Sequence, residues 1–595
     1  MRHLTLHYCV VNPPPTFQAF SKLIRLQLLN VAISDKSLEN LISRCPMLEN
    51  MELDIADPLN YIEINAPKLR SLNFGSKLNS ICFKNTPLLT DVSIIVANDV
   101  NHDSVNRGTC NLVEFFSSLP ALKNLCLGHS IIKTLITGII DRIPVKLPMP
   151  LVNLRQIYLF DICLSDLDEI RCLLCLIKSS PYLEEIIVII NQAINKEGGD
   201  DLPALELLEA QYDSGIKLNR LTKLRLIDVK GTKDIIAEID IGMPFPQSQE
   251  EVQIGPDIAQ AGDLPPVQTA SPDLDQWLLF LSRKDIKELI IDIGEDDWFR
   301  APSCVFFCPK LTHLVLVRCE LNPPPNFKGF LCLKHLSLQQ VIIPPHDIEI
   351  LISSCPLLES LTLSYFDSLE LTIRAPNLKY LNLEGEFKDI SLENTPHLIG
   401  ISVAMYMTDD IAEHFEQCSG CNFDKFLGGV PCLERLIGHI YFTKYLSIGN
   451  EQGNFPVTYQ NLKFIELYQV SFEDMKELLV VLRLIVSSPN LEELQISSSS
   501  ITTTTDIYDL EFWERDWPAD CTFGKLKIVH MTDFSGLPHE IAFIKFLLGH
   551  SPVLEQMIVA PTIYVTDKVV KMLIDLLTFR RASPQATVKF IQEPL

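Results

Sequence analysis

The chain has 595 residues, of which 47% are hydrophobic and 21% are charged, and its formal net charge is −25. This composition is typical of a well-packed protein of more than one domain and excludes a disordered chain. The negative charge repels phosphate and argues against nucleic acid and anionic membranes as partners, and no apolar run is long enough for a transmembrane helix.

Short apolar patterns of the form Leu-x-x-Leu-x-Leu recur along the chain and predict short strands. Near the N-terminus such patterns begin at Leu23 and Leu48. In the second half the starts Leu311, Leu333 and Leu358 lie 22 and 25 residues apart. That period is typical of leucine-rich repeats, in which one strand and one return segment form each unit. The predicted fold class is therefore an α/β leucine-rich-repeat solenoid.

The return segment before Leu48 predicts a helix. Its apolar residues Leu38, Leu41 and Ile42 fall on one helical face. Ser34 or Asp35 is placed to cap its start.

Residues 55–94 have a different pattern, with strand-like runs, short returns and no predicted helix. Ala-Pro at 66–67 and Thr-Pro at 86–87 favour tight, extended turns between these strands.

Two long stretches of the chain resemble each other. Residues 4–53 match residues 314–363 without a gap at an offset of 310, and residues 151–188 match 459–496 at an offset of 308. Convergent repeats do not reproduce whole irregular loops, so we interpret the chain as two tandem copies, or arcs, of one solenoid.

The tail, residues 526–591, predicts a last α/β unit. It reads as a strand, a helix over 538–548, a second strand, a helix around 568–579 and a closing strand over 587–591. An uncovered solenoid end exposes core and strand edge, so this tail is the predicted C-terminal cap.

The ordered motifs of the chain resemble the plant F-box/FBD/LRR-repeat family over nearly its whole length. They include Asp275-Gln276-Trp277, Asn322-Pro-Pro-Pro325, Cys355-Pro356-Leu-Leu-Glu359, Ala375-Pro376-x-Leu378, Ser551-Pro552-Val-Leu554-Glu555 and Arg581-Ala-Ser-Pro584. The resemblance implies a substrate receptor of a cullin-type ubiquitin ligase, in which an F-box docks a Skp-type adaptor and the repeats hold the target.

Family members usually begin with an F-box. No such segment precedes Met1 or stands before Asp273, so we expect the F-box to be missing and adaptor and cullin recruitment to depend on one being supplied. The predicted domains are a first copy over 1–240, truncated at its N-terminus and ending in a partial FBD, a flexible linker over 241–272, a second copy over 273–500 and an FBD-like domain over 501–595.

The 17 cysteines fall mostly inside apolar patterns, for example Cys126, Cys319, Cys332 and Cys355. They are interpreted as reduced, buried small hydrophobic residues, which favours a cytoplasmic or nuclear protein.

Two cysteine pairs have spacings of chemical interest. Cys172 and Cys175 are predicted to be core, on an apolar helix face. Cys418 and Cys421 with His414 have the spacing of half a metal site, but a loop with free thiols is favoured because no second pair follows. We therefore expect no metal.

The segment with Trp513, Arg515 and Trp517 combines two aromatic rings and a guanidinium in a predicted loop. Such residues are common protein-binding anchors, so these three are the candidate binding residues. The favoured alternative is that the two rings pack the tail against the last repeat.

No nucleophile, phosphate-loop, zinc-protease or dinucleotide motif occurs, so neither an enzyme nor a cofactor is expected. The functional hypothesis is a protein-recognition scaffold with an unknown protein ligand, resembling the substrate-binding part of an SCF-type ubiquitin ligase receptor. The alternatives are a non-ligase interaction scaffold, a small-molecule-sensing scaffold, or a non-functional fused gene product.

Overall fold

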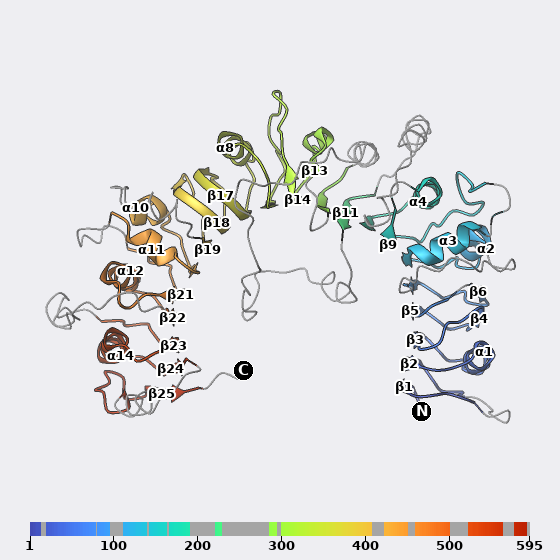
Figure 1. The fold of residues 1–595 in the computed structure, drawn as a ribbon, viewed down its shortest axis with the longest axis horizontal. Coiled ribbons are helices and arrows are strands. Elements are labelled where there is room, and N and C mark those ends of the chain that lie inside the picture. Colours follow the sequence, from blue (N-terminus) through green and yellow to red (C-terminus); the bar gives the residue numbers. More distant parts are fainter. Residues whose placement is uncertain are drawn as a thin grey trace. The chain divides into compact units, whose positions relative to one another are not determined.

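The computed structural model describes residues 1–13, 20–78, 80–95, 111–137, 139, 142–163, 166–190, 220–228, 285–293, 299–406, 422–449, 458–499, 522–562 and 576–591. It comprises two compact units, Met1–Pro324 and Pro325–Leu595. Each unit is built on a parallel sheet (Figure 1).

In unit 1 every successive strand of the main sheet pairs in parallel with the next. In order, these strands are β1 (His3–His7), β2 (Arg25–Val31), β3 (Asn50–Ile55), β5 (Ser71–Phe74), β7 (Asp91–Ile94), β8 (Asn124–Gly128), β9 (Gln156–Ile162), β10 (Glu185–Ile190), β11 (Lys223–Asp228), β12 (Glu288–Ile293) and β14 (His313–Val317).

Unit 2 repeats this arrangement. Its strands are β16 (His335–Gln339), β17 (Ser360–Arg374), β18 (Tyr380–Glu393), β19 (Gly400–Met405), β20 (Arg435–Gly438), β21 (Phe464–Val470), β22 (Glu493–Ser498), β23 (Ile528–Phe534), β24 (Gln556–Pro561) and β25 (Thr587–Phe590).

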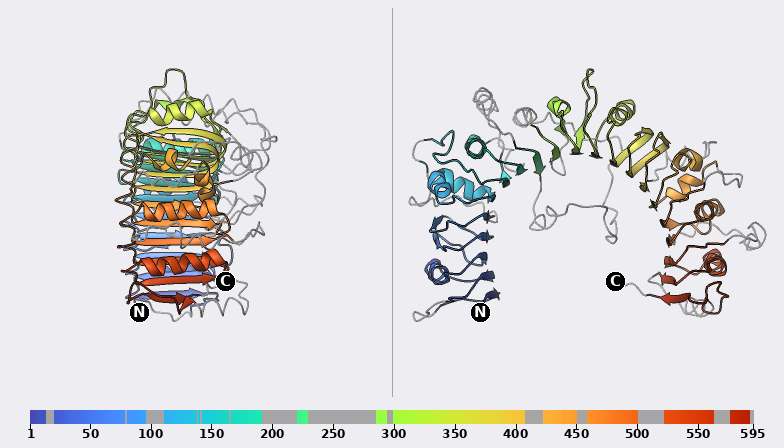
Figure 2. Two further views of the ribbon diagram at one scale, coloured as in Figure 1. Left: turned by 90° about the vertical axis from the view of Figure 1, so that its left-hand side faces the viewer. Right: turned by 180° about the vertical axis from the view of Figure 1, so that it is seen from behind.

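Within each unit the helices lie on one face of the main sheet (Figures 1 and 2). In unit 1 they are α1 (Asp35–Ser43), α2 (Leu112–Ser117), α3 (His129–Thr137), α4 (Leu167–Ser179) and the 3-10 turn η2 (Ser303–Phe307). In unit 2 they are α8 (Pro345–Ser353), α10 (Asn422–Leu427), α11 (Phe442–Ser447), α12 (Met475–Val486) and α14 (Pro538–His550). We call the opposite face of each sheet the open face.

The core of each unit lies between the sheet and its helices. Side chains alternate along a strand, so Leu26 and Leu28 of β2 point into the core and are fully buried, as are Leu336 and Leu338 of β16. Each such leucine contributes about 1.5–3 kcal/mol through burial. These observations confirm the leucine-rich-repeat solenoid.

The predicted helix before Leu48 is confirmed as α1, which buries its three apolar residues. Its cap differs from the expectation. Ser34 occupies the N-cap position, but its hydroxyl donates to Ser37 instead of accepting a backbone N–H group. The carboxylate of Asp35 accepts from the N–H group of Asn60, 3.3 Å away, and so joins α1 to the next repeat.

The helix-free pattern of residues 55–94 is also confirmed. The return strands β4 (Ile62–Asn65) and β6 (Ile81–Lys84) pair in parallel and form a second small sheet. Strands β13 (Phe299–Arg300) and β15 (Cys319–Glu320) form another. In unit 2 the strands β17 and β18 are long enough to run through both the first and the return part of a repeat.

Corresponding helices of the two copies begin at matched positions. Helices α1 and α8 are nine residues each and begin at 35 and 345. Even single contacts recur: the carboxylate of Glu39 accepts from the N–H of Glu63 at 2.9 Å, and that of Glu349 from the N–H of Thr372 at 2.7 Å. The duplication seen in the sequence is therefore a duplication of the structure.

The sheet of unit 1 crosses the boundary between the two copies. Strand β11 of the first copy pairs in register with β12 of the second, from Lys223 opposite Glu288 to Asp228 opposite Ile293. The Arg225 guanidinium donates to Glu288 at 2.6 Å across this junction. The predicted linker over 241–272 lies outside the described residues, and the predicted domain boundaries stay predictions.

The predicted tail folds as part of the same sheet. Strands β23, β24 and β25 continue from β22 in parallel, and α14 follows β23. Most of the predicted helix around 568–579 lies outside the described residues.

The cysteine prediction holds for Cys319 and Cys355, which are buried and free, whereas Cys126 and Cys332 are half-buried. Cys126 is only half-covered because it occupies an open-face position of β8. Among the described helices, none has the length and apolar character needed to cross a membrane.

We expect Leu26→Ala in unit 1 and Leu336→Ala in unit 2 each to lower the free energy of unfolding by about 2–5 kcal/mol, because each leaves a cavity in a closed layer. Urea denaturation followed by circular dichroism measures the change. Ser337→Ala, on the open face beside Leu336, is the control and should change stability by less than about 0.5 kcal/mol. A loss below about 1 kcal/mol for either leucine variant would contradict the layered core.

Candidate functional site

The candidate binding residues Trp513, Arg515 and Trp517 lie outside the described residues, and so do His414, Cys418 and Cys421. Their roles stay predictions. Within the described ranges no group of His, Cys, Asp and Glu side chains could hold a metal ion.

The core assignment of the other cysteine pair is confirmed. Cys172 and Cys175 are buried in α4. Burial raises the pKa of both thiols, that of Cys175 to about 11, so neither is suited to nucleophilic chemistry.

The most distinctive described surface lies on the open face of unit 2. We call it the open-face cluster. It combines aromatic and charged side chains with one serine, from β17 to β21 and from the residues that directly follow β19 and β20. Its members are Tyr365, Glu384, Ser402, Tyr406, Arg435, His439, Glu466 and Tyr468.

One half of the cluster is built around Glu384. The rings of Tyr365 and Tyr406 are stacked with centroids 6.4 Å apart. The Tyr406 hydroxyl donates to the Glu384 carboxylate at 2.5 Å. Burial raises the pKa of both tyrosines, and the charge of Glu384 and hydrogen bonding to it raise them further, so both hydroxyls stay protonated as donors.

A strand irregularity presents Tyr365 to solvent. The β17–β18 register shifts between Ser364 and Phe366, and Tyr365 between them has φ 60° and is 44% exposed. A positive φ is uncommon in a bulky residue, but here it recurs near the ends of other strands, at Asn30, Gln340 and Gln469, so it is a feature of the repeat. Gly385 permits the close approach, since its φ is 148° and an added Cβ would lie 2.6 Å from the Phe366 carbonyl oxygen.

The other half of the cluster is built around Glu466. Its carboxylate accepts from the Tyr468 hydroxyl at 2.5 Å and lies 3.6 Å from the Arg435 guanidinium. The Tyr468 ring is stacked on His439 at a centroid distance of 5.0 Å. The Arg435 guanidinium lies 3.9 Å from the centroid of the Phe464 ring. Burial lowers the pKa of His439, so its imidazole is neutral at pH 7.

Strand β19 separates the two halves and carries small residues on its open face. In register with Tyr380, Asn382 and Glu384 it presents Gly400, Ser402 and Ala404. Ser402 reaches across to the second half, with its hydroxyl 3.4 Å from Nε2 of His439. The open-face side chains of β19 are therefore smaller than the aromatic and charged side chains of the two halves.

The first copy has the same repeat architecture but carries different residues at the matched open-face positions. Matched position by position, Glu384 corresponds to Gly75, Arg435 to Asn124, His439 to Gly128, Glu466 to Tyr158 and Tyr468 to Phe160. The core leucines of these strands are buried in both copies. The solenoid thus does not need the open-face cluster for folding.

Reasoning from the sequence missed the cluster, because its residues are spread over 365–468 at strand positions that look merely polar. The available signal was the comparison of the two copies, in which carboxylates, a histidine and an arginine appear where the first copy has glycines, a tyrosine and an asparagine.

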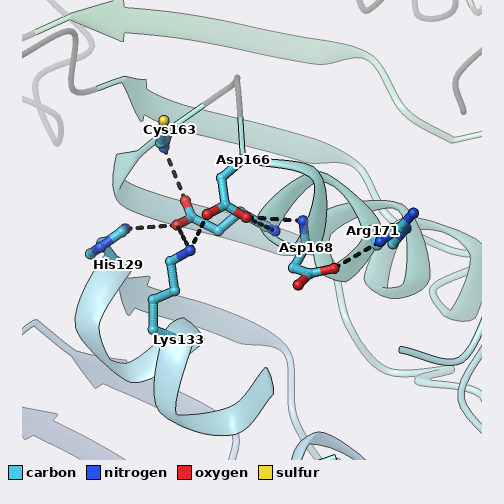
Figure 3. A network of polar contacts seen from close by, with 7 residues as sticks. His129, Lys133, Cys163, Asp166, Asp168 and Arg171 are labelled. Carbon is cyan, nitrogen blue, oxygen red and sulfur yellow. Dashed lines mark hydrogen bonds and ion pairs between the residues drawn. The ribbon is translucent and has the colours of Figure 1, made fainter. Parts of the chain in front are cut away.

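A second polar network, in unit 1, is structural in character (Figure 3). The Glu169 carboxylate is buried and accepts from the N–H group of Cys163 at 3.0 Å. Lys133 and His129 of α3 reach it from the preceding repeat, at 3.2 and 2.9 Å. Burial opposes the charge of Lys133, but hydrogen bonds to Asp166 and Glu169 outweigh it and raise the lysine pKa.

The same device recurs in unit 2, where a glutamate near the start of a helix ties down the preceding loop. Glu477 of α12 accepts from the Thr443 hydroxyl at 2.7 Å. Glu540 of α14 accepts from the N–H groups of Gly536 and Leu537 at 2.6 and 2.7 Å, and from Ser498 of the preceding repeat. Because these carboxylates already bind groups of their own loop and of the neighbouring repeat, we assign them no ligand.

We expect Gly385→Ala to lower the free energy of unfolding by more than about 1 kcal/mol, because alanine is strained at this φ and meets the Phe366 backbone. Thermal denaturation measures the change. Gly549→Ala is the matched control, since nothing lies within 4 Å of its Cβ position and its helical setting favours alanine. Equal behaviour of the two variants would contradict a backbone requirement at Gly385.

We expect Glu540→Ala to lower the free energy of unfolding by about 1–3 kcal/mol, because it leaves the partly buried N–H groups of Gly536 and Leu537 without an acceptor. Burial raises the Glu540 pKa, and the hydrogen bonds to it only partly offset this effect. The folded state therefore binds this proton more tightly, so the contribution of Glu540 to stability falls as pH rises through the raised pKa. Urea denaturation at pH 5 and pH 8 measures the free energy of unfolding. We expect Glu540→Gln to be more stable relative to wild type at pH 8 than at pH 5. The opposite trend would show that the pKa of Glu540 is not raised in the folded state.

Comparison with known proteins agrees with the repeat architecture. A family model described as FBD-associated F-box protein At5g56370, LRR repeats, matches residues 1–188 and 274–496. A second model, described as FBD, matches residues 518–559.

Individual relatives are similar to parts of the chain. The F-box/FBD/LRR-repeat protein At1g13570 of Arabidopsis thaliana is 55% identical over 323 residues, covering 54% of this chain and 77% of that protein. The protein At3g26920 of the same plant, also described as F-box/FBD/LRR-repeat, is 23% identical and covers 52% of this chain and 74% of its own length. A solved LRR protein of Leptospira interrogans, LIC12759, is 12% identical with a TM-score of 0.29, covering 94% of this chain and 95% of its own.

The repeat model spans more than half of the chain, and the tail matches the FBD model. The resemblance seen in the sequence is therefore confirmed, and this chain belongs to the plant F-box/FBD/LRR-repeat family.

Proposed function

We propose that the chain is a protein-recognition scaffold whose second unit binds a partner protein on the open-face cluster. The observation that carries the proposal is the difference between the two copies. Both fold with the same core, but the second has two stacked aromatic pairs, two carboxylates and a guanidinium on its open face, where matched positions of the first hold Gly75, Asn124, Gly128, Tyr158 and Phe160. Residues that folding does not require are the ones available for recognition.

The cluster has the composition of a binding surface. Tyrosine and arginine are enriched at interface positions that dominate binding energy, because they combine a large contact area with hydrogen-bonding groups. Here these residues are partly exposed and are held in place by contacts to neighbouring strands. Such preorganisation lowers the entropy lost on binding.

Family membership extends the proposal to ubiquitin ligation. The relatives are named F-box proteins, and in this scheme the repeats act as the substrate-binding part of an SCF-type receptor, with a Skp-type adaptor and cullin recruited through an F-box. The family is a repeat scaffold and not a class of enzyme, so catalysis has no place in the proposal.

A photo-crosslinking experiment tests the scaffold. Benzoylphenylalanine replaces Ser402 in the cluster or Ser93, its counterpart in the first copy, within the full chain expressed in plant cells. We expect a specific protein adduct from position 402 that is absent from position 93. Identical adducts at both positions, or none at 402, would refute a partner site on the second unit.

The ligase extension has its own test. The chain is fused to a known F-box and reconstituted with a Skp-type adaptor, a cullin complex and the partner captured through position 402. We expect that partner to be ubiquitinated faster than with a fusion that carries Tyr406→Ala and His439→Ala. Equal rates would leave the scaffold without a role in substrate choice.

A further inference from the structure

The chemistry of the open-face cluster indicates what kind of side chain it receives. We propose that the cluster binds an extended, positively charged segment of a partner protein, with two Lys or Arg residues that reach Glu384 and Glu466. This inference rests on the proposed scaffold function and specifies its partner.

The charge of the cluster favours a cationic ligand. The cluster holds two carboxylates and one guanidinium. Arg435 lies 3.6 Å from Glu466, whose side chain is only 11% exposed, so Glu384 is the more open of the two carboxylates. No cationic side chain is in ion-pair contact with Glu384 within the part of the chain that the structure describes. The neighbouring imidazole of His439 is neutral, because burial lowers its pKa. The cluster thus carries excess negative charge that a cationic ligand would neutralise.

The hydrogen bonds of the two carboxylates favour a ligand that donates. Each carboxylate is oriented by a tyrosine hydroxyl, from Tyr406 to Glu384 and from Tyr468 to Glu466, both at 2.5 Å. A carboxylate has about four lone-pair sites, so these bonds fix its direction without using its whole capacity. The ligand groups that suit the remaining sites are donors, and lysine and arginine offer donors only.

The two aromatic stacks of the cluster also favour a cation. The Tyr365–Tyr406 stack joins β17 to the residue after β19, and the His439–Tyr468 stack joins the residue after β20 to β21. Strand β19 itself carries Ser402 and Ala404 on its open face. Aromatic faces attract cations by about 0.5–2 kcal/mol, depending on desolvation. The low side chains of β19 leave the ring-bearing positions accessible to a chain that crosses the strands.

The distance between the two carboxylates determines how far apart the two basic residues of the ligand lie. Glu384 lies on β18 and Glu466 on β21, and β19 and β20 pair between them. Neighbouring strands are about 4.8 Å apart, so the two carboxylate positions are roughly 15 Å apart. An extended chain advances about 3.4 Å per residue, so the two basic residues should be four or five positions apart.

Fluorescence anisotropy of labelled peptides with the full chain tests this proposal. The probe is a glycine-rich peptide with one Lys and one Arg four positions apart, and the comparison peptides carry acetyl-lysine and citrulline, or the two basic residues side by side. We expect only the spaced basic peptide to bind strongly, and Glu384→Gln with Glu466→Gln to weaken that binding at least ten-fold.

The control removes the same charge from the open face of the first copy, by Glu52→Gln with Asp91→Asn. It should change binding less than two-fold. Equal weakening by both double variants would show general attraction to an acidic protein and would overturn the proposal, as would equal binding of the neutral peptide. Circular dichroism establishes that each variant is folded.

The outcome is separable from that of the scaffold proposal. If position 402 still captures its partner in the Glu384→Gln, Glu466→Gln variant at wild-type yield, the scaffold stands and recognition of a basic segment is wrong. If the spaced peptide binds through the two glutamates but position 402 captures no protein, the peptide chemistry stands and the scaffold proposal is wrong.

Discussion

The structure of each unit depends on one constraint, the parallel register that sets the first strand of every repeat beside the first strand of the next. This register places Leu26 opposite Met51 in unit 1 and Leu336 opposite Leu361 in unit 2. Once the leucines are aligned in layers, the residues between them must line up in columns on the open face. The same constraint that builds the core therefore gathers residues distant in sequence, such as Glu384 and Glu466, on one surface.

The buried glutamates strengthen this register between helices as the leucines do between strands. Glu477 and Glu540 accept hydrogen bonds from their own loop and from the preceding repeat. Glu169 accepts one from its own loop and forms ion pairs with the preceding repeat. A buried carboxylate is stabilising only when its acceptors are satisfied. All three glutamates lie near the start of a helix. The FBD tail is therefore connected to the repeat before it by the same kind of contact that connects the repeats to one another, and its strands continue the same sheet.

The sequence alone predicted the periodic part of the fold well, because burial of apolar residues at fixed spacing leaves few alternatives. Leu38, Leu41 and Ile42 located α1, and the prolines of 66–67 and 86–87 indicated the helix-free repeats. It could not predict the open-face cluster, since the bulge that turns Tyr365 outward and the register that joins β18 to β21 through β19 and β20 are tertiary facts. The role of Ser34 was also beyond its reach, because a competing acceptor, Ser37, decides where that hydroxyl points.

The pairing of β11 with β12 has a consequence for how the chain divides. The limits of common ancestry, read from the repeat of the sequence, fall between the two copies, whereas the first compact unit runs on to Pro324, inside the second copy. The boundary between the two sequence copies therefore differs from the boundary between the two compact units. A fragment cut at the ancestral line would carry β12 with a bare edge, ready to pair with another chain, and its aggregation would say nothing about the stability of the copy itself.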